Sequence, residues 1–262
     1  MSLAISNDRQ NSLPPSKLPQ QLGTGGTGGC LGGKRASPNG TYHASKTALA
    51  SAAEFLPSRL TLPALRQAVQ TCRGCDLYKF ATQAVLGEGK RSAAIVLIGE
   101  QPGDEEDRKG RPFVGPAGRI LDRALADAGI DRNAVYVTNA VKHFKFEERG
   151  KRRIHKKPNG LELRACRPWL EAEMGVIKPS ILVCLGATAA QTVFGPSWRV
   201  TKERGRFVAH PWAPQATSTI HPSAILRAPT DEQRHTEYAA FVADLKKVQA
   251  IARQTLTASG GN

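Results

Sequence analysis

Three polar side chains of kinds that can orient, protonate or hydrogen-bond a ligand lie at the ends of apolar runs. Glu100 lies in the turn GEQPG, Asn139 follows the run AVYVT, and His221 opens the segment HPS. A carboxylate can orient a reacting group, an amide can both donate to and accept from a pyrimidine edge, and an imidazole can donate to a carbonyl or phosphate oxygen. Taken singly, each is equally well explained as a turn or capping residue, so a shared site requires a fold that brings them together.

An aromatic loop residue and a basic run add to these candidates. Phe113 lies in a loop, where an aromatic ring either stacks on a planar base or packs as a lid on the core. Lys151, Arg152 and Arg153 precede His155, and a run of this kind is ordinarily a solvated loop that touches phosphates. The formal net charge of +15 and the pI near 10.0 agree with a nucleic-acid partner, although a solvated basic surface explains them as well.

Four of the five cysteines have a pattern that metal sites use. Cys72 and Cys75 are separated by two residues, whereas Cys166 lies on a predicted helix and Cys184 within a predicted strand. Four thiolates can hold zinc or a [4Fe-4S] cluster, and one close pair with two distant single ligands favours a cluster that joins separated elements. The alternative is that Cys166 and Cys184 are buried apolar thiols, which the surrounding ILVCL run favours for Cys184. Cys30 has no evident partner.

Apolar runs and amphipathic periodicity alternate along the chain from residue 60 onward. They predict strands at residues 93–98, 134–141, 180–185, 206–209 and 216–220, and helices at residues 60–72, 115–129, 161–176, 187–194 and from 231 onward. Such alternation indicates an α/β fold, a three-layer α/β/α sandwich with a central, mainly parallel sheet. Because ligands bind beyond the carboxyl ends of such strands, Glu100, Asn139 and His221 are expected to converge there.

Composition and the lengths of the apolar runs predict the domain organisation and the compartment. Residues 1–57 are rich in Gly, Ser and Pro and predict a flexible tail, and residues 58–256 are expected to form the folded domain. No apolar run is long enough to cross a bilayer, and the first residues lack the pattern of a secretory signal. We therefore expect a cytoplasmic protein, with a monomer as the default.

The motifs, in order along the chain, resemble those of a known enzyme family. The segments CRGCDLY, GEQPGDEED, GRPFVGPAGRILD, VYVTNAVKHFKF, KRRIHKKPN, ILVCLGATAA and TIHPSAILR are similar to those of the family-4, iron-sulfur uracil-DNA glycosylases, and within them to the crosslinking group known as UdgX. The resemblance runs from Cys72 to Arg227. It implies the uracil-DNA glycosylase fold and a [4Fe-4S] cluster with a structural role.

The resemblance also implies roles for individual residues. Phe113 corresponds to the ring that stacks on uracil, Asn139 to the reader of its Watson-Crick edge, and His221 to the donor that stabilises negative charge on the departing base. Such donors lower the barrier because breaking an N-glycosidic bond leaves a uracil anion and a cationic sugar. The residues that correspond to the cluster ligands are Cys72, Cys75, Cys166 and Cys184.

Two departures from ordinary family-4 enzymes are features of the crosslinking group. Gln101 stands where those enzymes usually have alanine, and the segment KRRIH is an insertion. In the crosslinking group the histidine of this insertion attacks the sugar C1′, so His155 is matched to the nucleophile, with Glu100 as its hydrogen-bond partner. Gln101 and Asp104 are expected to share the catalytic work around the sugar, with their roles left open.

The resemblance predicts an enzyme that removes uracil from single-stranded, and also double-stranded, DNA and then bonds covalently to the abasic sugar. It would associate with the bacterial nucleoid when acting on DNA. Two alternatives stay open: a hydrolytic glycosylase with ordinary turnover, and a non-catalytic, metal-stapled nucleic-acid binder. The residues expected to contact DNA are Lys151, Arg152, Arg153, Ser223 and Arg227.

Overall fold

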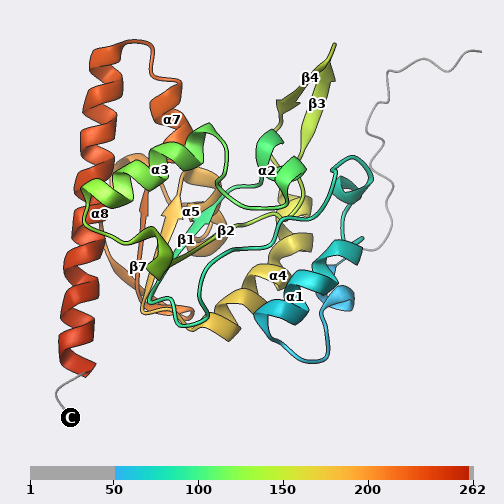
Figure 1. Ribbon diagram of the computed structural model, residues 1–262, viewed down its shortest axis with the longest axis horizontal. Coiled ribbons are helices and arrows are strands. Elements are labelled where there is room, and N and C mark those ends of the chain that lie inside the picture. The colour runs from blue at the N-terminus through green and yellow to red at the C-terminus, as the bar shows by residue number, and fades with distance from the viewer. Residues whose placement is uncertain (1–50, 260–262) are drawn as a thin grey trace, which may run out of the picture. The chain divides into compact units, whose positions relative to one another are not determined.

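The structure, a computed structural model, describes the backbone of residues 51–259 (Figure 1). Side chains are described as far as residue 254. Residues 1–50, which include most of the predicted tail and Cys30, lie outside the described residues. The predicted domain start at residue 58 stays a prediction, and the described chain begins before it. Ala52 is buried, and Phe55 packs against the same apolar cluster, so the ordered chain already contributes to the core before that residue.

A five-stranded sheet forms the centre of the domain. Its first four strands are parallel and the last pairs antiparallel to its neighbour, which confirms the predicted mainly parallel α/β sheet. Every residue of β1, β2 and β5 is buried, as expected where helices cover both faces of a parallel sheet. In spatial order the strands are β2 (Val135–Asn139), β1 (Ile95–Gly99), β5 (Ile181–Leu185), β7 (Ala213–Thr219) and β6 (Val208–His210).

Helices cover the two faces of the sheet. Leu97 and Val183 point into one cluster with α3, α7 and α8, whereas Val96 and Leu182 point into another with α4, α5 and α6. This alternation follows from the two-residue repeat of a strand; Figure 1 shows α3 and α8 on one side of the sheet and α4 on the other. The helices are α1 (Leu62–Ala68), α2 (Asp104–Lys109), α3 (Pro116–Asp127), α4 (Gly160–Ile177), α5 (Ala187–Phe194), α6 (Val200–Glu203), α7 (Pro222–Leu226) and α8 (Asp231–Ser259).

The segment before β1 packs on the outer side of α4. Trp169 of α4 is fully buried there, against apolar residues of this segment that include Leu65 and Cys72. None of the helices formed by residues 51–259 is both long and apolar enough to cross a membrane. Besides α1, the segment forms single 3₁₀ turns at Ala52–Phe55, Val69–Thr71 and Asp76–Lys79, and a further turn, Arg132–Ala134, precedes β2.

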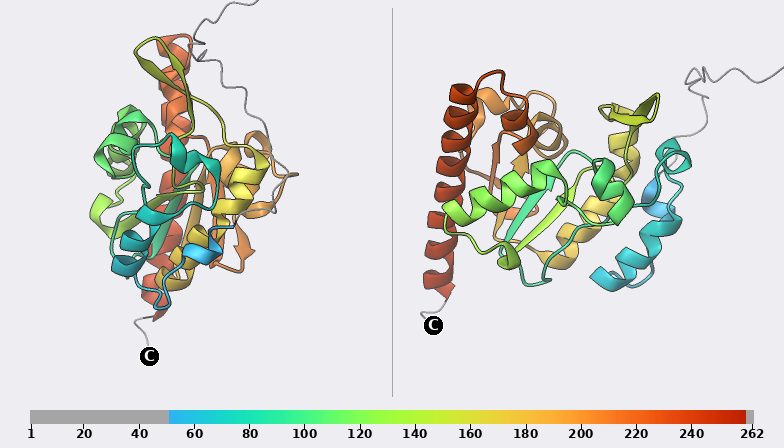
Figure 2. Two further views of the ribbon diagram at one scale, coloured as in Figure 1. Left: turned by 90° about the vertical axis from the view of Figure 1, so that its right-hand side faces the viewer. Right: turned by 45° about the horizontal axis from the view of Figure 1, so that its top comes forward.

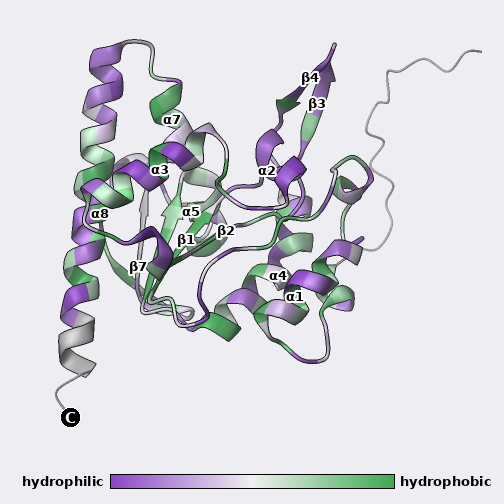
Figure 3. Cartoon of the chain, in the orientation of Figure 1, coloured by the Kyte–Doolittle hydropathy of each residue, from purple (hydrophilic) through white to green (hydrophobic). Residues whose placement is uncertain are grey.

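A two-stranded hairpin separate from the main sheet carries the basic run. β3 (Phe146–Arg149) pairs antiparallel with β4 (Arg152–His155), and Gly150 turns the chain at a φ of +59°. Figure 2 shows the hairpin standing away from the sheet, and Figure 3 shows it as mostly hydrophilic toward its tip. The sequence predicts a loop here because four-residue strands of mostly charged residues carry little apolar alternation.

Candidate active site

The carboxyl ends of β1 and β2 bring the predicted site residues together. Gly99 ends β1 directly opposite Asn139, which ends β2. A Cβ atom at Gly99 would lie 2.3 Å from Asn139 Oδ1 and 2.7 Å from Phe113 Cζ, so the position has room only for glycine. The amide and the aromatic ring therefore meet at the end of β1, as expected from the sequence, and Glu100 follows directly.

Phe113 adopts a backbone conformation that residues other than glycine rarely adopt. Its φ is +55°, its ring is only 7% exposed, and the ring lies nearly parallel to that of His221, with centroids 6.1 Å apart and 28° between planes. The loop fits over the start of α3 because residue 118 is glycine: a Cβ there would lie 1.8 Å from the Phe113 carbonyl oxygen. A left-handed conformation of a non-glycine residue costs about 1–3 kcal/mol and is typical of functional sites.

Hydrogen bonds fix the proton of His221 on one ring nitrogen. The Ser223 backbone N–H donates to Nδ1 at 3.1 Å, so Nδ1 is the acceptor and the neutral ring carries its proton on Nε2. Burial lowers the pKa of His221 to about 4. The Ser223 hydroxyl lies 2.8 Å from Nδ1 and accepts from Arg227 Nη1 at 3.0 Å. His221 is therefore a neutral donor at physiological pH, with Nε2–H available to a ligand.

Glu100 lies between His155 and Thr188. Its Oε1 is 3.3 Å from His155 Nε2, and Oε2 accepts a short hydrogen bond from the Thr188 hydroxyl at the start of α5. Burial raises the pKa of Glu100, but the hydrogen bonds from His155 and Thr188 outweigh it and hold the pKa below its ordinary value. An ionised carboxylate therefore faces the His155 ring, whose side chain is 50% exposed.

The side chain of Gln101 fastens the base of the hairpin. Its Oε1 accepts from the Lys145 N–H at 3.1 Å, and its Nε2 donates to the carbonyl oxygens of Lys145 and Lys156, each at 3.0 Å. These bonds hold the chain on both sides of β3 and β4, and the side chain is only 7% exposed. The structure thus gives Gln101 a part in placing the hairpin, and its predicted catalytic role stays a prediction.

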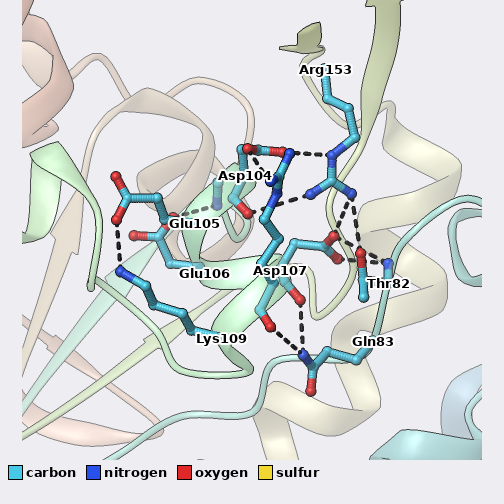
Figure 4. Close-up of polar contacts among 10 residues, drawn as sticks. Thr82, Gln83, Asp104, Glu105, Glu106, Asp107, Lys109 and Arg153 are labelled. Carbon is cyan, nitrogen blue, oxygen red and sulfur yellow. Dashed lines mark hydrogen bonds and ion pairs between the residues drawn. The ribbon is translucent and has the colours of Figure 1, made fainter. Parts of the chain in front are cut away.

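Arg153 anchors the hairpin to α2 (Figure 4). Its Nε lies 2.5 Å from Asp104 Oδ1 and its Nη1 2.7 Å from Asp107 Oδ2. The guanidinium also lies 5.5 Å and 5.0 Å from the ring centroids of Phe144 and Phe146, and the side chain is only 15% exposed. The charge of Arg153 is thus paired with two carboxylates, while its predicted phosphate contact and the predicted catalytic role of Asp104 stay predictions. Lys151 and Arg152 are exposed at the tip.

Three of the four predicted cluster cysteines lie together. Cys72 Sγ accepts from Trp169 Nε1 at 3.1 Å, and Cys166 Sγ accepts from the Lys142 N–H at 3.2 Å. Burial raises the pKa of Cys75 to about 11, and Cys72 raises it further. Burial likewise raises the pKa of Cys166 to about 12, with both other thiols contributing. The three thiols are therefore close enough to influence one another.

The prediction of Cys184 as a ligand is wrong. Its side chain is fully buried in β5, in the apolar cluster under α4 and α5, and burial alone raises its pKa. It lies with Ile98 and Leu182 and not in the cluster that holds Cys72 and Cys166. The apolar-thiol alternative was the correct one, because this side chain of a central strand points into a helix-covered face.

A buried histidine that sequence reasoning missed is a candidate fourth ligand. His143 is 4% exposed, and burial lowers its pKa to about 4, which keeps the imidazole neutral. It follows Lys142, whose N–H binds Cys166. Among the described residues no three His, Cys, Asp or Glu side chains surround a single-ion position. Three thiols and a neutral imidazole are a donor set that can hold either a four-iron cluster or a single zinc ion.

A buried ion pair behind Asn139 also escaped the sequence reasoning. Lys142 and Glu173 are both 0% exposed, with Nζ 2.5 Å from Glu173 Oε2. Lys142 Nζ also donates to the Asn139 carbonyl oxygen at 2.6 Å and to the Thr138 hydroxyl at 2.8 Å. Glu173 accepts in addition from the Tyr136 hydroxyl at 2.8 Å. The pair thus fixes the backbone that presents Asn139; a lysine inside the apolar stretch NAVKH was the available signal.

Glu106 joins two loops of the site. Its carboxylate accepts from the Gly115 N–H at 2.7 Å and from the Gly103 N–H at 3.0 Å. The first loop follows Glu100 and the second carries Phe113, so one buried carboxylate holds both. Glutamate at the third position of α2 was the signal in the sequence, because it is where a capping side chain reaches back to the chain before a helix.

The mainly parallel sheet defines an α/β protein, and Phe113, Asn139 and His221 lie together at its carboxyl edge. Residues 86–246 match the family model described as the Uracil DNA glycosylase superfamily, and the chain belongs to that superfamily.

Within the superfamily, the chain is similar to proteins named type-4 uracil-DNA glycosylase. The one from Thermotoga maritima is 36% identical over 187 residues, which cover 71% of this chain and 92% of the relative. Those from Sulfurisphaera tokodaii and Archaeoglobus fulgidus are 33% and 35% identical, cover 73% and 69% of this chain, and are matched over 85% and 87% of their own lengths.

Proposed function

We propose that the chain excises uracil from DNA by cleaving the N-glycosidic bond and then captures the abasic sugar through His155. Excision is supported by the type-4 relatives and by the meeting of Phe113, Asn139 and His221 at one end of the sheet. Capture is supported by one observation above all, the contact of His155 with the ionised carboxylate of Glu100.

Excision needs the bond from C1′ to N1 of uracil to break, with the electron pair leaving on the base. The His221 Nε2–H donates to a uracil oxygen and stabilises the anion, while Phe113 stacks on the ring and Asn139 binds its edge. Preorganised donors of this kind are each worth about 3–4 kcal/mol of barrier lowering. Because His221 is neutral, it donates without giving up a full proton.

Capture follows on the cationic sugar that remains. The ring nitrogen of His155 that does not face Glu100 gives its lone pair to C1′, and a nitrogen–carbon bond forms. The imidazole becomes a cation that keeps its proton on the nitrogen facing Glu100, whose carboxylate balances the new charge. The uracil anion takes a proton from water on release, and no oxidant or reductant is needed.

A [4Fe-4S] cluster would be held by Cys72, Cys75 and Cys166, with His143 as the fourth donor. When bound, it supplies a structural link between the segment before β1 and α4 and takes no part in bond breaking. Cys166→Ala protein is expected to lose the brown colour and the iron, whereas Cys184→Ala, the matched control, keeps both. Equal loss of iron in the two variants would return Cys184 to the ligand set.

The test of capture is a denaturing gel of purified protein incubated with a uracil-containing oligonucleotide. We expect a heat-stable band at the summed mass, lost in His155→Ala but kept in Lys151→Ala, a control from the same hairpin. His155→Ala should release uracil with turnover, because water then reaches the sugar. A crosslink that survives this substitution would mean another nucleophile.

The hydrolytic alternative is favoured by the exposure of His155, since half of its side chain is open to water. It predicts multiple turnover by the wild-type chain with no shifted band. A non-catalytic binder would instead leave uracil in place. The gel and a uracil-release assay on the same samples separate the three.

A further inference from the structure

A groove runs between the first half of α4 and α5. It has a volume of about 710 Å³ and is lined by residues that include Lys157, Arg164, Thr188 and Phe194. This volume lies within the range of pockets that hold ligands of several hundred daltons. Thr188 lines the groove and also donates to Glu100, so the groove lies next to the candidate active site.

The charged side chains that line the groove are all cations. None of the described residues that line it carries a carboxylate, whereas Lys157, Arg164 and Arg167 are cations. Arg167 is occupied by Glu171 at 2.7 Å and by the Thr192 carbonyl oxygen at 2.9 Å. Within the part of the chain that the structure describes, Lys157 and Arg164 make no ion pair. Two cations are therefore available to an anionic ligand.

The start of α4 adds to this positive character. Asn159 caps the helix by accepting from the Glu162 N–H at 2.9 Å, and the chain then runs helically for 18 residues. A Cβ at Gly160 would lie 3.2 Å from Arg164 Nη1, so the guanidinium lies over the first turn. Peptide dipoles and the arginine thus act in the same place. The opposite wall mixes the polar side chains of Thr188, Gln191 and Thr192 with an apolar wall section of Val193, Phe194 and Pro196. Phe194 is stacked on Trp198, with 4.1 Å between ring centroids.

From these features we infer that the groove binds the sugar-phosphate backbone of the DNA strand next to the target nucleotide. Phosphates pair with Lys157 and Arg164, and the apolar wall section contacts sugars and bases. The assignment rests on the proposed function, and it moves the main phosphate contacts away from Arg153, whose charge is already paired. Lys157 lies two residues beyond His155, so a strand in the groove leads directly to the nucleophile.

The test compares Lys157→Ala/Arg164→Ala with Lys90→Ala/Arg91→Ala. The control removes the same charge from an exposed turn before β1, at the opposite edge of the sheet. Single-turnover uracil excision from a single-stranded 15-mer gives a maximal rate and a half-saturating enzyme concentration. We expect the groove variant to raise the half-saturating concentration about tenfold with an unchanged maximal rate. The slope of the logarithm of the binding constant against the logarithm of the salt concentration should become about 1.4 smaller in magnitude. Each lost phosphate contact on a single strand contributes about 0.7 to that slope.

A control variant that loses as much affinity as the groove variant would overturn the proposal, as would a groove variant with the wild-type slope. A lower maximal rate at unchanged half-saturation would also overturn it. Fluorescence anisotropy with a labelled, uracil-free strand measures binding without chemistry. If the wild-type chain excised no uracil, a selective loss of this binding would support the groove while refuting the proposed function.

Discussion

Replacing Lys142 with methionine would leave the carboxylate of Glu173 buried without its cation. Both side chains are fully buried and 2.5 Å apart, so no solvent screens the remaining charge. Removing one partner of such a pair costs about 3–5 kcal/mol. For a chain of this size each kcal/mol lowers the melting temperature by about 2–4 °C, so the expected drop is roughly 6–20 °C.

The double variant Lys142→Met/Glu173→Gln separates stability from function. It leaves no uncompensated charge, so urea denaturation should show it to be more stable than Lys142→Met. The Asn139 carbonyl oxygen nevertheless loses its donor, which now lies at 2.6 Å. Uracil excision should therefore stay reduced about tenfold in the recovered protein. A loss of less than about 1 kcal/mol in Lys142→Met, or a double variant no more stable than the single one, would show that Glu173 does not keep an uncompensated buried charge.

Three further predictions concern the site. Thr188→Val removes a hydrogen-bond donor from Glu100 and so raises the pKa of that carboxyl. In a pH profile of the crosslinking rate, the fall on the acid side should therefore begin at a higher pH. Thr188→Ser should restore the wild-type profile, and Thr192→Val, one turn along α5, should leave it unchanged. Gly99→Ala places a methyl group 2.3 Å from Asn139 Oδ1 and should abolish uracil excision. The control Gly175→Ala in α4, which has open space around it, should keep the activity. Equal activities of the two variants would refute the close contact between residue 99 and Asn139. The pKa of His221 is lowered to about 4, whereas an unfolded histidine titrates near 6.5. The unfolded chain therefore binds more protons between these values, and the free energy of unfolding should fall as pH drops from 6.5 to 4; urea denaturation should show a smaller fall for His221→Asn, and an equal fall would contradict the assignment.

The main sheet could be predicted because its inner strands are continuous apolar runs between turns. β1, β2 and β5 are buried on both faces, and the positions that follow them had to lie at one edge. Glu100 and Asn139 were placed at this edge in this way, and His221 was placed there by the strand predicted at residues 216–220, which corresponds to β7. The hairpin could not be predicted, because β3 and β4 are short and mostly charged and are held by side chains from other segments.

What the sequence could not predict at the site has a common physical origin. Cysteine spacing does not tell which layer a strand residue faces, so Cys184 was grouped with thiols in a different cluster. A basic run does not tell which carboxylates will lie beside it, so the pairing of Arg153 with Asp104 and Asp107 could not be predicted. Both depend on contacts between distant segments, which local patterns do not record.

The way the hairpin is fastened limits how its chemistry can be transplanted. A protein engineer who moved only residues 146–155 into another scaffold would leave behind Gln101, Asp104 and Asp107, which belong to a different stretch of sequence and make the bonds that orient the insert. The grafted imidazole would then sample many positions and rarely meet a sugar. A working graft has to carry both the hairpin and the segment that contains Gln101, Asp104 and Asp107.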